Sequence, residues 1–258
     1  MWLASKGGMS SRVPWLLLGA AGGYALLKRA GSHSGATDEE VNATLPGDDV
    51  IPHPMIETTH GIGIDAAPAV VWRWLMQCGY RGAGRAGWYT DSVVDVFMDN
   101  VVFRLTVPEG KRPEGAWRRS AEELLPGFEG SAVGDVVPDG PPGSASFVVR
   151  AVVPERSWVL HSDTHMRYLA PAFLHGTALQ TWGEFTWVFV LKPTDAGGTR
   201  LLLRTRARYG PRGIRGVLLP VLYAGEALFP RLLLRGIKRR AEGRAGGAAV
   251  ERGAVQES

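Results

Sequence analysis

The sequence predicts an α+β protein built from one antiparallel sheet and one long C-terminal helix. Two observations predict this class. Strand-like segments follow one another between residues 132 and 209 without intervening helices, which is typical of an antiparallel sheet. Apolar residues then recur at helical spacing from Ile214 to about Ala241. The chain has 258 residues, 45% of them hydrophobic, so it is long enough for one large domain with short appendages.

The domain is expected to begin with a strand and a helix. Every second residue between 56 and 64 is apolar or β-branched, with His60 on the same face, which predicts a half-buried strand. Pro68 occupies a first-turn position, where its missing N–H is tolerated, so a helix is expected from there to about Gln77. The five further strands are expected at 132–137, 147–153, 157–162, 185–191 and 200–209.

On the last strand, small or apolar residues alternate with arginines. The first set is Leu201, Leu203, Thr205 and Ala207, and the second is Arg200, Arg204, Arg206 and Arg208. Because a buried unpaired arginine costs several kcal/mol, we expect the first set to face the helix and the arginines to face water. The same alternation places Phe185, Trp187, Phe189 and Leu191 on the helix side of the preceding strand.

The first 31 residues are expected to form a membrane anchor. The 15 residues from Val13 to Leu27 carry no charge and are flanked by Arg12 and by Lys28-Arg29. As a helix this run reaches only about 22 Å of a hydrocarbon core of about 30 Å, so the basic side chains would have to snorkel. The alternative is a secretory signal, but its cleavage site would follow a basic pair, which signal peptides avoid.

We therefore expect a single-pass, membrane-anchored protein. Basic residues are equal in number on the two sides of the run, so the side of the domain is undetermined, with the cytoplasmic side favoured. Residues 32–54 are polar and rich in turn formers, which predicts a tether. The folded domain is expected over 55–242, and 243–258, rich in Gly and Ala, is expected to be a disordered tail.

Composition and motifs exclude several classes of function. The net charge is +4, but no nucleic-acid-binding motif accompanies it, so we expect no nucleic-acid partner. Cys78 is the single cysteine, which excludes an intrachain disulfide and a cysteine-built zinc site. His161 and His165 would lie about 13 Å apart on a strand, so we expect no metal site there.

The run from Gly82 to Gly87 matches the pattern G-x-G-x-x-G of dinucleotide-binding turns. Such a turn needs a strand before it and a helix after it, so that the helix N-terminus meets the pyrophosphate. Here the run follows a predicted helix and leads into Trp88 and Tyr89. We interpret it as a loop and expect no cofactor.

Short segments spread over residues 36–241 carry a resemblance to a known family. They are 36–41 (ATDEEV), 45–49 (LPGDD), 62–77 (IGIDAAPAVVWRWLMQ), 87–89 (GWY), 132–135 (AVGD), 187–191 (WVFVL), 199–206 (TRLLLRTR) and 234–241 (LRGIKRRA). In this order they resemble the START-like superfamily, also called SRPBCC, in its polyketide cyclase/dehydrase and lipid transport branch. The resemblance implies a helix-grip fold, with a curved antiparallel sheet wrapped around the C-terminal helix. It also implies an internal cavity for a lipid- or polyketide-like molecule.

The function expected from these observations is the binding or transfer of a hydrophobic small molecule without catalysis. The residues expected to line the site are Trp88, Tyr89, Trp182, Phe185, Trp187, Phe189, Thr205 and Ala207. Along the last strand the inward residues become smaller towards Thr205 and Ala207, which predicts space for the ligand there. The oligomeric state is left open.

Two other functions compete with this one. A cyclase or dehydratase would use Tyr89, Asp91, His161 or Glu184 as general acid or base, and needs at least two of them to converge on the cavity. A membrane-surface module would use the arginine face and the basic end of the C-terminal helix.

Overall fold

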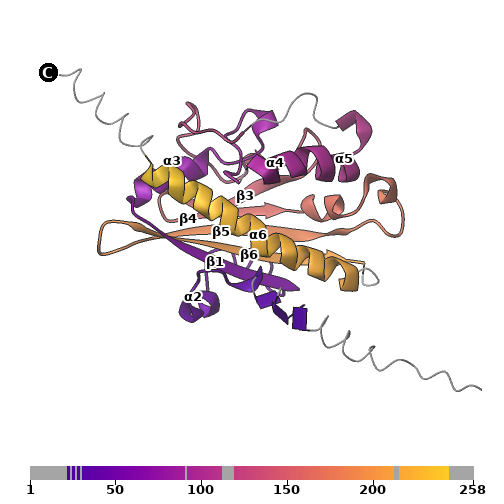
Figure 1. Cartoon of the computed structure of the whole chain (residues 1–258), viewed down its shortest axis with the longest axis horizontal. Helices are drawn as coiled ribbons and strands as arrows, with labels where there is room; N and C mark the ends of the chain where they lie inside the picture. The colour runs from indigo at the N-terminus through magenta and orange to yellow at the C-terminus, as the bar shows by residue number, and fades with distance from the viewer. Residues whose placement is uncertain are drawn as a thin grey trace, which may run out of the picture.

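The computed structural model describes residues 22–243, with gaps at 24, 27, 30, 91, 112–118 and 212–214. Within these ranges, six strands form one antiparallel sheet in the order β1-β6-β5-β4-β3-β2 (Figure 1). The strands are β1 (Ile56–Ile64), β2 (Val136–Pro138), β3 (Ser146–Val153), β4 (Ser157–Ser162), β5 (Trp182–Pro193) and β6 (Thr199–Gly210). The expected strands are confirmed, with ends that differ by a few residues.

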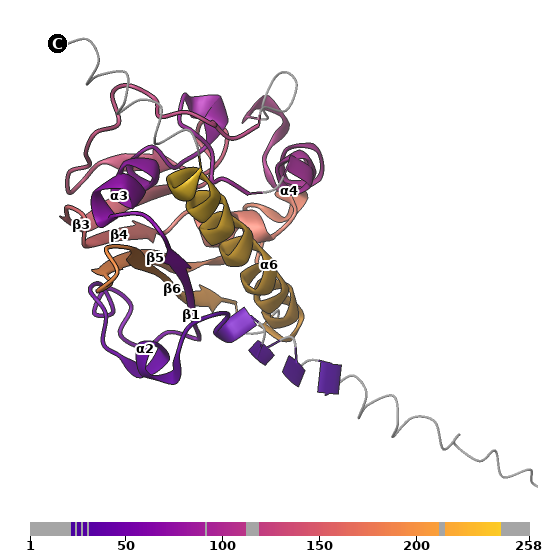
Figure 2. The same cartoon turned by 60° about the vertical axis from the view of Figure 1, so that its left-hand side comes forward.

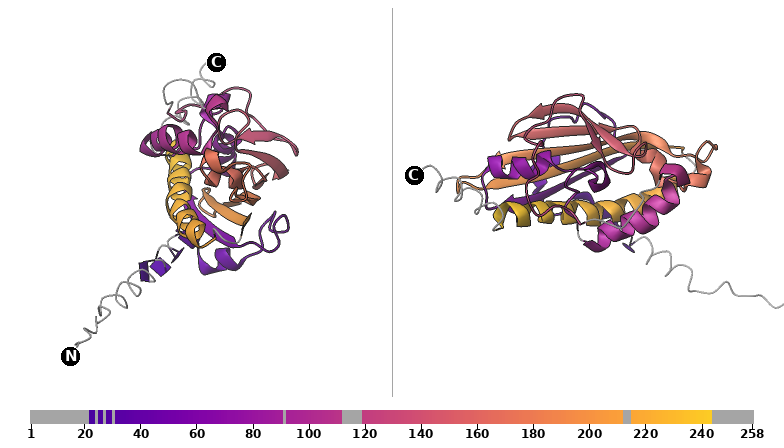
Figure 3. Two further views of the ribbon diagram at one scale, coloured as in Figure 1. Left: turned by 90° about the vertical axis from the view of Figure 1, so that its right-hand side faces the viewer. Right: turned by 90° about the horizontal axis from the view of Figure 1, so that it is seen from above.

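The long C-terminal helix α6 (Arg215–Glu242) crosses one face of the sheet (Figure 2). Beside its C-terminal half lies α3 (Pro68–Met76), which begins at the expected proline. The remaining helices are α2 (Asp38–Asn42), α4 (Ser92–Phe97) and α5 (Phe103–Thr106), with a π-helical turn, Met98–Val102, joining the last two. Figure 3 shows α4 and α5 on the same side of the sheet as α6. A curved antiparallel sheet covered by a C-terminal helix is the helix-grip arrangement, so the expected fold is confirmed at this level.

The main core fills the space between this inner face of the sheet and the helices α3 and α6. Trp187, Phe189 and Leu191 of β5 pack there with Leu201 and Leu203 of β6. From α6 the same core receives Leu233, Leu234 and Ile237, and from α3 it receives Trp74 and Leu75 among others. The strand alternation predicted this inward set, because successive side chains of a strand point to opposite faces.

The outer face of the sheet is covered as well, by the segment before β1. Leu45 packs there against Val159, Val188 and Leu202, and Ile51 is also buried. Residues 37–54, part of the tether expected over 32–54, thus lie on the sheet and include α2. The helix begins with a capping box, in which Thr37 accepts from the backbone N–H of Glu40 and the Glu40 side chain accepts from that of Thr37.

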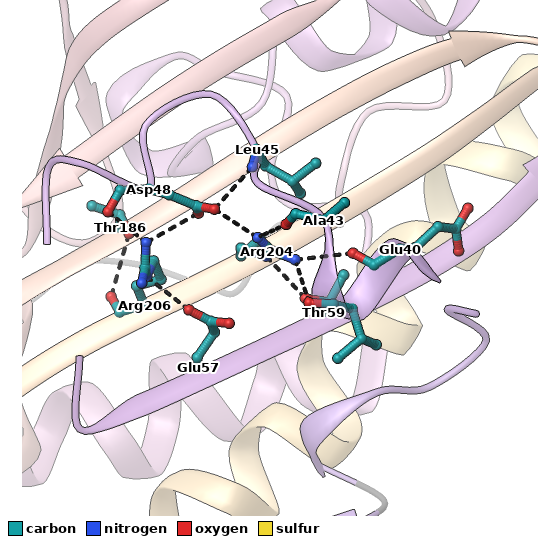
Figure 4. A network of polar contacts seen from close by, with 10 residues as sticks. Glu40, Ala43, Leu45, Asp48, Glu57, Thr59, Thr186, Arg204 and Arg206 are labelled. Carbon is teal, nitrogen blue, oxygen red and sulfur yellow. Dashed lines mark hydrogen bonds and ion pairs between the residues drawn. The ribbon is translucent and has the colours of Figure 1, made fainter. Parts of the chain in front are cut away.

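Arg204 and Arg206 of β6 face this segment rather than water, which corrects the sequence-based expectation for these two arginines (Figure 4). Arg208 stays half-exposed, as expected. Arg204 is 1% exposed, and its guanidinium donates to the backbone oxygens of Glu40, Val41 and Ala43 and to Asp48. Arg206 pairs with Asp48 and Glu57. The expectation considered only unpaired arginines, whereas a buried guanidinium is tolerated when its donors are all satisfied. Because Arg204 and Arg206 are covered and paired within the protein, they are not available to a membrane surface on this side.

The expected membrane anchor is corrected as well. Every helix within the described ranges is too short or too polar to cross a lipid bilayer. Within these ranges the finding contradicts the single-pass anchor expected over residues 1–31 and the location at a membrane that followed from it. Most of the apolar run 13–27 lies outside the described residues, as does the tail from residue 244.

Candidate functional site

The inner face of the sheet carries a wall of aromatic rings. Trp187 lies at its centre, with ring centroids 5.1 Å from Trp88, 5.2 Å from Phe147 and 5.8 Å from Phe185. On the helix side, Phe229 of α6 stacks on Trp187 at 5.6 Å. The expected ligand residues Trp88, Phe185 and Trp187 are thus brought together, and Phe189 adjoins Trp187 at 6.3 Å.

A polar row interrupts this wall where three strands lie side by side. Thr58 of β1 is opposite Thr205 of β6, and Thr205 is opposite Trp187 of β5. The Thr205 hydroxyl and the Trp187 indole N–H are buried, and neither has a hydrogen-bond partner in the part of the chain that the structure describes. The indole N–H of Trp88 is in the same situation. Such groups normally find a partner when buried, so these positions are suited to a ligand with a polar atom.

A carboxylate from the helix completes the polar row. Glu226 of α6 accepts a 2.6 Å hydrogen bond from the Thr58 hydroxyl. Its Oε2 also lies 3.7 Å from Nε2 of His60, whose side chain is fully buried. Nδ1 of His60 accepts from the backbone N–H of Ser34, which places the proton of the neutral ring on Nε2, towards Glu226. The row separates the main core from a smaller apolar cluster around Ala207.

Ala207 itself lies in that smaller cluster. It is 2% exposed and packs with Ile56, Met166, Tyr209 and Tyr223. The expected ligand space beside Ala207 is therefore occupied by side chains of this cluster. Trp182, at the start of β5, is 58% exposed and lies away from the aromatic wall.

Tyr89 is buried with its hydroxyl already satisfied. It donates to the carbonyl of Trp74 and accepts from the amide of Gln77, both at 2.8 Å. The guanidinium of Arg240 lies 4.5 Å over its ring. Burial raises the pKa of Tyr89 well above its usual range. A hydroxyl that holds its proton and already makes two hydrogen bonds is unsuited to acid–base work.

The other catalytic candidates do not converge with Tyr89. His161 and Glu184 alternate with the inward residues of β4 and β5, so both lie on the outer face. His161 contacts Arg150, and Glu184 forms an exposed ion pair with Arg208. Asp91 lies outside the described residues.

The sequence reasoning missed a histidine–carboxylate pair beside the aromatic wall. Nε2 of His165 lies 2.6 Å from Oδ2 of Asp139. The His165 ring packs on Phe147, with centroids 4.2 Å apart, and on Phe185 at 5.2 Å. His165 was considered together with His161 as a possible metal site, and Asp139 was not singled out. Asp139 and His165 are far apart in the sequence, so no local pattern indicates that they form a pair. The contact arises because β2 and β4 lie on either side of β3.

A polar depression of about 210 Å³ lies near the C-terminal end of α6. Its lining residues are Thr90, Asp95, Arg119, Ser120, Glu122, Arg239 and Arg240. Arg240 is occupied within the protein, since it donates to the carbonyl of Ala121 and to Glu122. The charged lining does not match an apolar ligand, so this depression is distinct from the aromatic wall.

Two further motifs are the possible metal site and the glycine run 82–87. Among residues 22–243, less the gaps given above, there is no group of three or more His, Cys, Asp or Glu side chains placed to hold a metal ion. The glycine run 82–87 follows α3 and forms a loop with a 3₁₀ turn, Arg81–Ala83. This agrees with its interpretation as a loop.

No family model matches this chain, and no curated protein does. Solved structures that it resembles include protein MLL2253 from Mesorhizobium loti, at 13% identity over 72% of this chain and 96% of that one, with a TM-score of 0.35. The Aha1 dimer from Colwellia psychrerythraea matches at 14% identity over 73% and 97%, with a TM-score of 0.33. Ara h 8.0201 matches at 12% identity over 74% and 98%, with a TM-score of 0.23. At such TM-scores these likenesses carry no argument about function.

Proposed function

We propose that this protein binds a hydrophobic small molecule carrying a hydrogen-bonding oxygen, between the inner face of the sheet and α6. One observation carries the proposal. The Thr205 hydroxyl and the Trp187 indole N–H belong to residues paired across β6 and β5, and both groups are buried at the aromatic wall without partners among the described residues. Ligand sites typically combine an apolar lining with a few such polar groups.

The geometry of the wall supports this chemistry. The rings of Trp88, Phe147, Trp187 and Phe229 offer apolar surface, whose burial against a ligand contributes about 25 cal/mol per Å². Trp187 is a hydrogen-bond donor only, so the ligand atom beside it is an acceptor such as a carbonyl or ether oxygen. Phe229 comes from the middle of α6, and ligand entry requires this part of the helix to shift from the sheet.

A cyclase or dehydratase receives less support. Of its expected residues, Tyr89 has its hydroxyl satisfied, while His161 and Glu184 lie on the opposite face of the sheet. We therefore propose binding or transfer, and we assign no catalytic residue.

The proposal is tested with prodan, a neutral naphthalene ketone whose emission shifts to the blue in apolar surroundings. We expect saturable binding, and we expect Thr205→Val to weaken it about 5-fold, because this change removes one hydrogen bond at nearly constant shape. The matched control is Thr186→Val. Thr186 is also buried in the sheet, but its side chain lies on the outer face and donates to the Arg206 carbonyl.

Two results would count against the proposal. One is that prodan does not bind the full chain at all. The other is that Thr205→Val and Thr186→Val weaken binding equally, which indicates loss of stability rather than loss of a ligand contact. Thermal unfolding of both variants shows whether each remains cooperatively folded.

A further inference from the structure

His165 and Asp139 form a hydrogen-bonded pair, and the ring of His165 contacts the aromatic wall. Asp139 follows β2, and His165 begins the 3₁₀ turn His165–Leu169 that follows β4. Their side chains are 20% and 13% exposed, respectively, so the 2.6 Å contact is largely shielded from water. The His165 backbone N–H donates to the Ser162 hydroxyl, which fixes the turn that presents the ring.

The pair determines which ring nitrogen carries the proton. An ionised carboxylate only accepts hydrogen bonds, so Nε2 of His165, which faces Asp139, must donate. The neutral ring then has its lone pair on Nδ1. That atom is buried and has no partner among the residues that the structure describes. A histidine whose distal nitrogen is held by a carboxylate presents its other nitrogen as an oriented acceptor.

The surroundings of the ring belong to the proposed binding site. His165 lies against Phe147 and Phe185, and each of these two rings also contacts Trp187. The wall therefore offers a donor at Trp187 and an acceptor at His165, with apolar rings around them. An aromatic or other planar molecule with a hydroxyl group matches this arrangement.

We propose that His165, positioned by Asp139, accepts a hydrogen bond from a hydroxyl group of the ligand, so that the protein selects hydroxylated apolar molecules over their ethers. This inference rests on the proposed function, since it names the class of ligand that the aromatic wall binds. His165 is the binding residue, and Asp139 is a positioning residue that sets the tautomer.

The test compares 2-naphthol with 2-methoxynaphthalene, which differ by the presence of the donor. Binding to the full chain is followed by quenching of tryptophan fluorescence. We expect 2-naphthol to bind about 10-fold more tightly, as one buried hydrogen bond allows. In His165→Phe the preference should disappear while 2-methoxynaphthalene still binds. The matched control His161→Phe changes a histidine on the outer face of β4, the strand before the turn, and should keep the preference.

The positioning role of Asp139 is tested separately, with a variant of Asp139 and with an NMR measurement on His165. In Asp139→Asn an amide can donate to Nε2, which allows the proton to move to Nδ1, so the preference for 2-naphthol should fall. In the unchanged protein, ¹⁵N NMR should show Nδ1 of His165 unprotonated when the ring is neutral, and its signal should shift when 2-naphthol is added. This measurement needs no variant and so does not depend on whether a variant folds.

The outcomes separate the two proposals. If prodan binds but 2-naphthol and 2-methoxynaphthalene bind equally, or if Nδ1 carries the proton, the assignment of His165 is wrong and the proposed function stands. If neither prodan nor the naphthalene pair binds, the proposed function fails and the assignment of His165 fails with it. If the preference persists in His165→Phe, another group recognises the hydroxyl.

Discussion

The guanidinium of Arg204 and the carboxylate of Asp48 lie 2.7 Å apart. This ion pair holds the segment before β1 on the outer face of the sheet. Their side chains are 2% and 15% exposed, respectively. Asp48 also accepts from the backbone N–H of Leu45, at 2.9 Å, and pairs with Arg206. A single carboxylate thus compensates two arginines of β6 and closes a turn of the covering segment.

Asp48→Ala should strongly destabilise the protein. Removing one partner of a buried ion pair leaves the other charge uncompensated, which costs about 3–5 kcal/mol. The measurement is the free energy of unfolding by urea. Glu184→Ala is the control, because the Arg208–Glu184 pair is 3.4 Å long with both side chains substantially exposed, and such pairs contribute less than about 1 kcal/mol. Equal losses of unfolding free energy in the two variants would show that the ion pairs of Asp48 with Arg204 and Arg206 do not hold the segment on the sheet.

Glu40 should make the stability depend on pH in the acid range. Hydrogen bonds from Arg200 are the main reason that its pKa is lowered from 4.5 to about 2. As the pH falls below 4.5, the unfolded chain takes up a proton at Glu40 while the folded protein does not. Stability is therefore lost progressively down to a pH of about 2.

The variant Glu40→Gln isolates this contribution. The difference in unfolding free energy between the unchanged protein and Glu40→Gln should be largest near pH 6 and should shrink towards pH 3. Urea unfolding at several pH values measures it. A difference that stays constant across this range would mean that the Arg200 contact does not lower the pKa of Glu40.

Two glycines of α6 should respond to alanine in opposite directions. A Cβ at Gly236 would lie 1.9 Å from the carbonyl oxygen of Tyr89, whereas a Cβ at Gly225 would meet nothing within 4 Å. Alanine is favoured over glycine inside a helix by about 1 kcal/mol. Gly225→Ala should therefore stabilise the protein by up to that amount, and Gly236→Ala should destabilise it by about 1–3 kcal/mol through overpacking.

Thermal unfolding of the two alanine variants checks this prediction. Tyr89 is 1% exposed and its hydroxyl makes two hydrogen bonds, so it has little freedom to move away from the helix. A stabilised Gly236→Ala variant would show that α6 is packed less closely on Tyr89 than the structure indicates.

Cys78 should be unreactive in the folded protein. Its side chain is fully buried in the main core, and burial raises its pKa to about 12. Because the thiolate is the reactive form, a disulfide reagent at pH 8 should modify Cys78 only after denaturant is added. Rapid reaction without denaturant would indicate that α3, which ends shortly before Cys78, opens readily.

The sequence by itself determined the six strands and the helices α3 and α6, but not the short helices α2, α4 and α5. Alternation located β1 and β6, and the proline at position 68 marked the start of α3, because these signals depend on the geometry of a single segment. The inward set of β5 and β6 followed from the same alternation, since only one parity avoids placing arginines in the main core. The inward positions of Phe185 and Trp187 on the aromatic wall were predictable for this reason, whereas Trp88 lies in a loop to which alternation does not apply.

Only the tertiary structure decided what covers each face and which polar groups meet. Arg204 is buried because Asp48 and backbone oxygens from a distant segment satisfy it, and no alternation within β6 predicts that partner. Glu226 meets Thr58, and Asp139 meets His165, across long stretches of chain. Local patterns specify which side of an element is apolar, whereas ion pairs and hydrogen bonds between elements depend on how the chain packs as a whole.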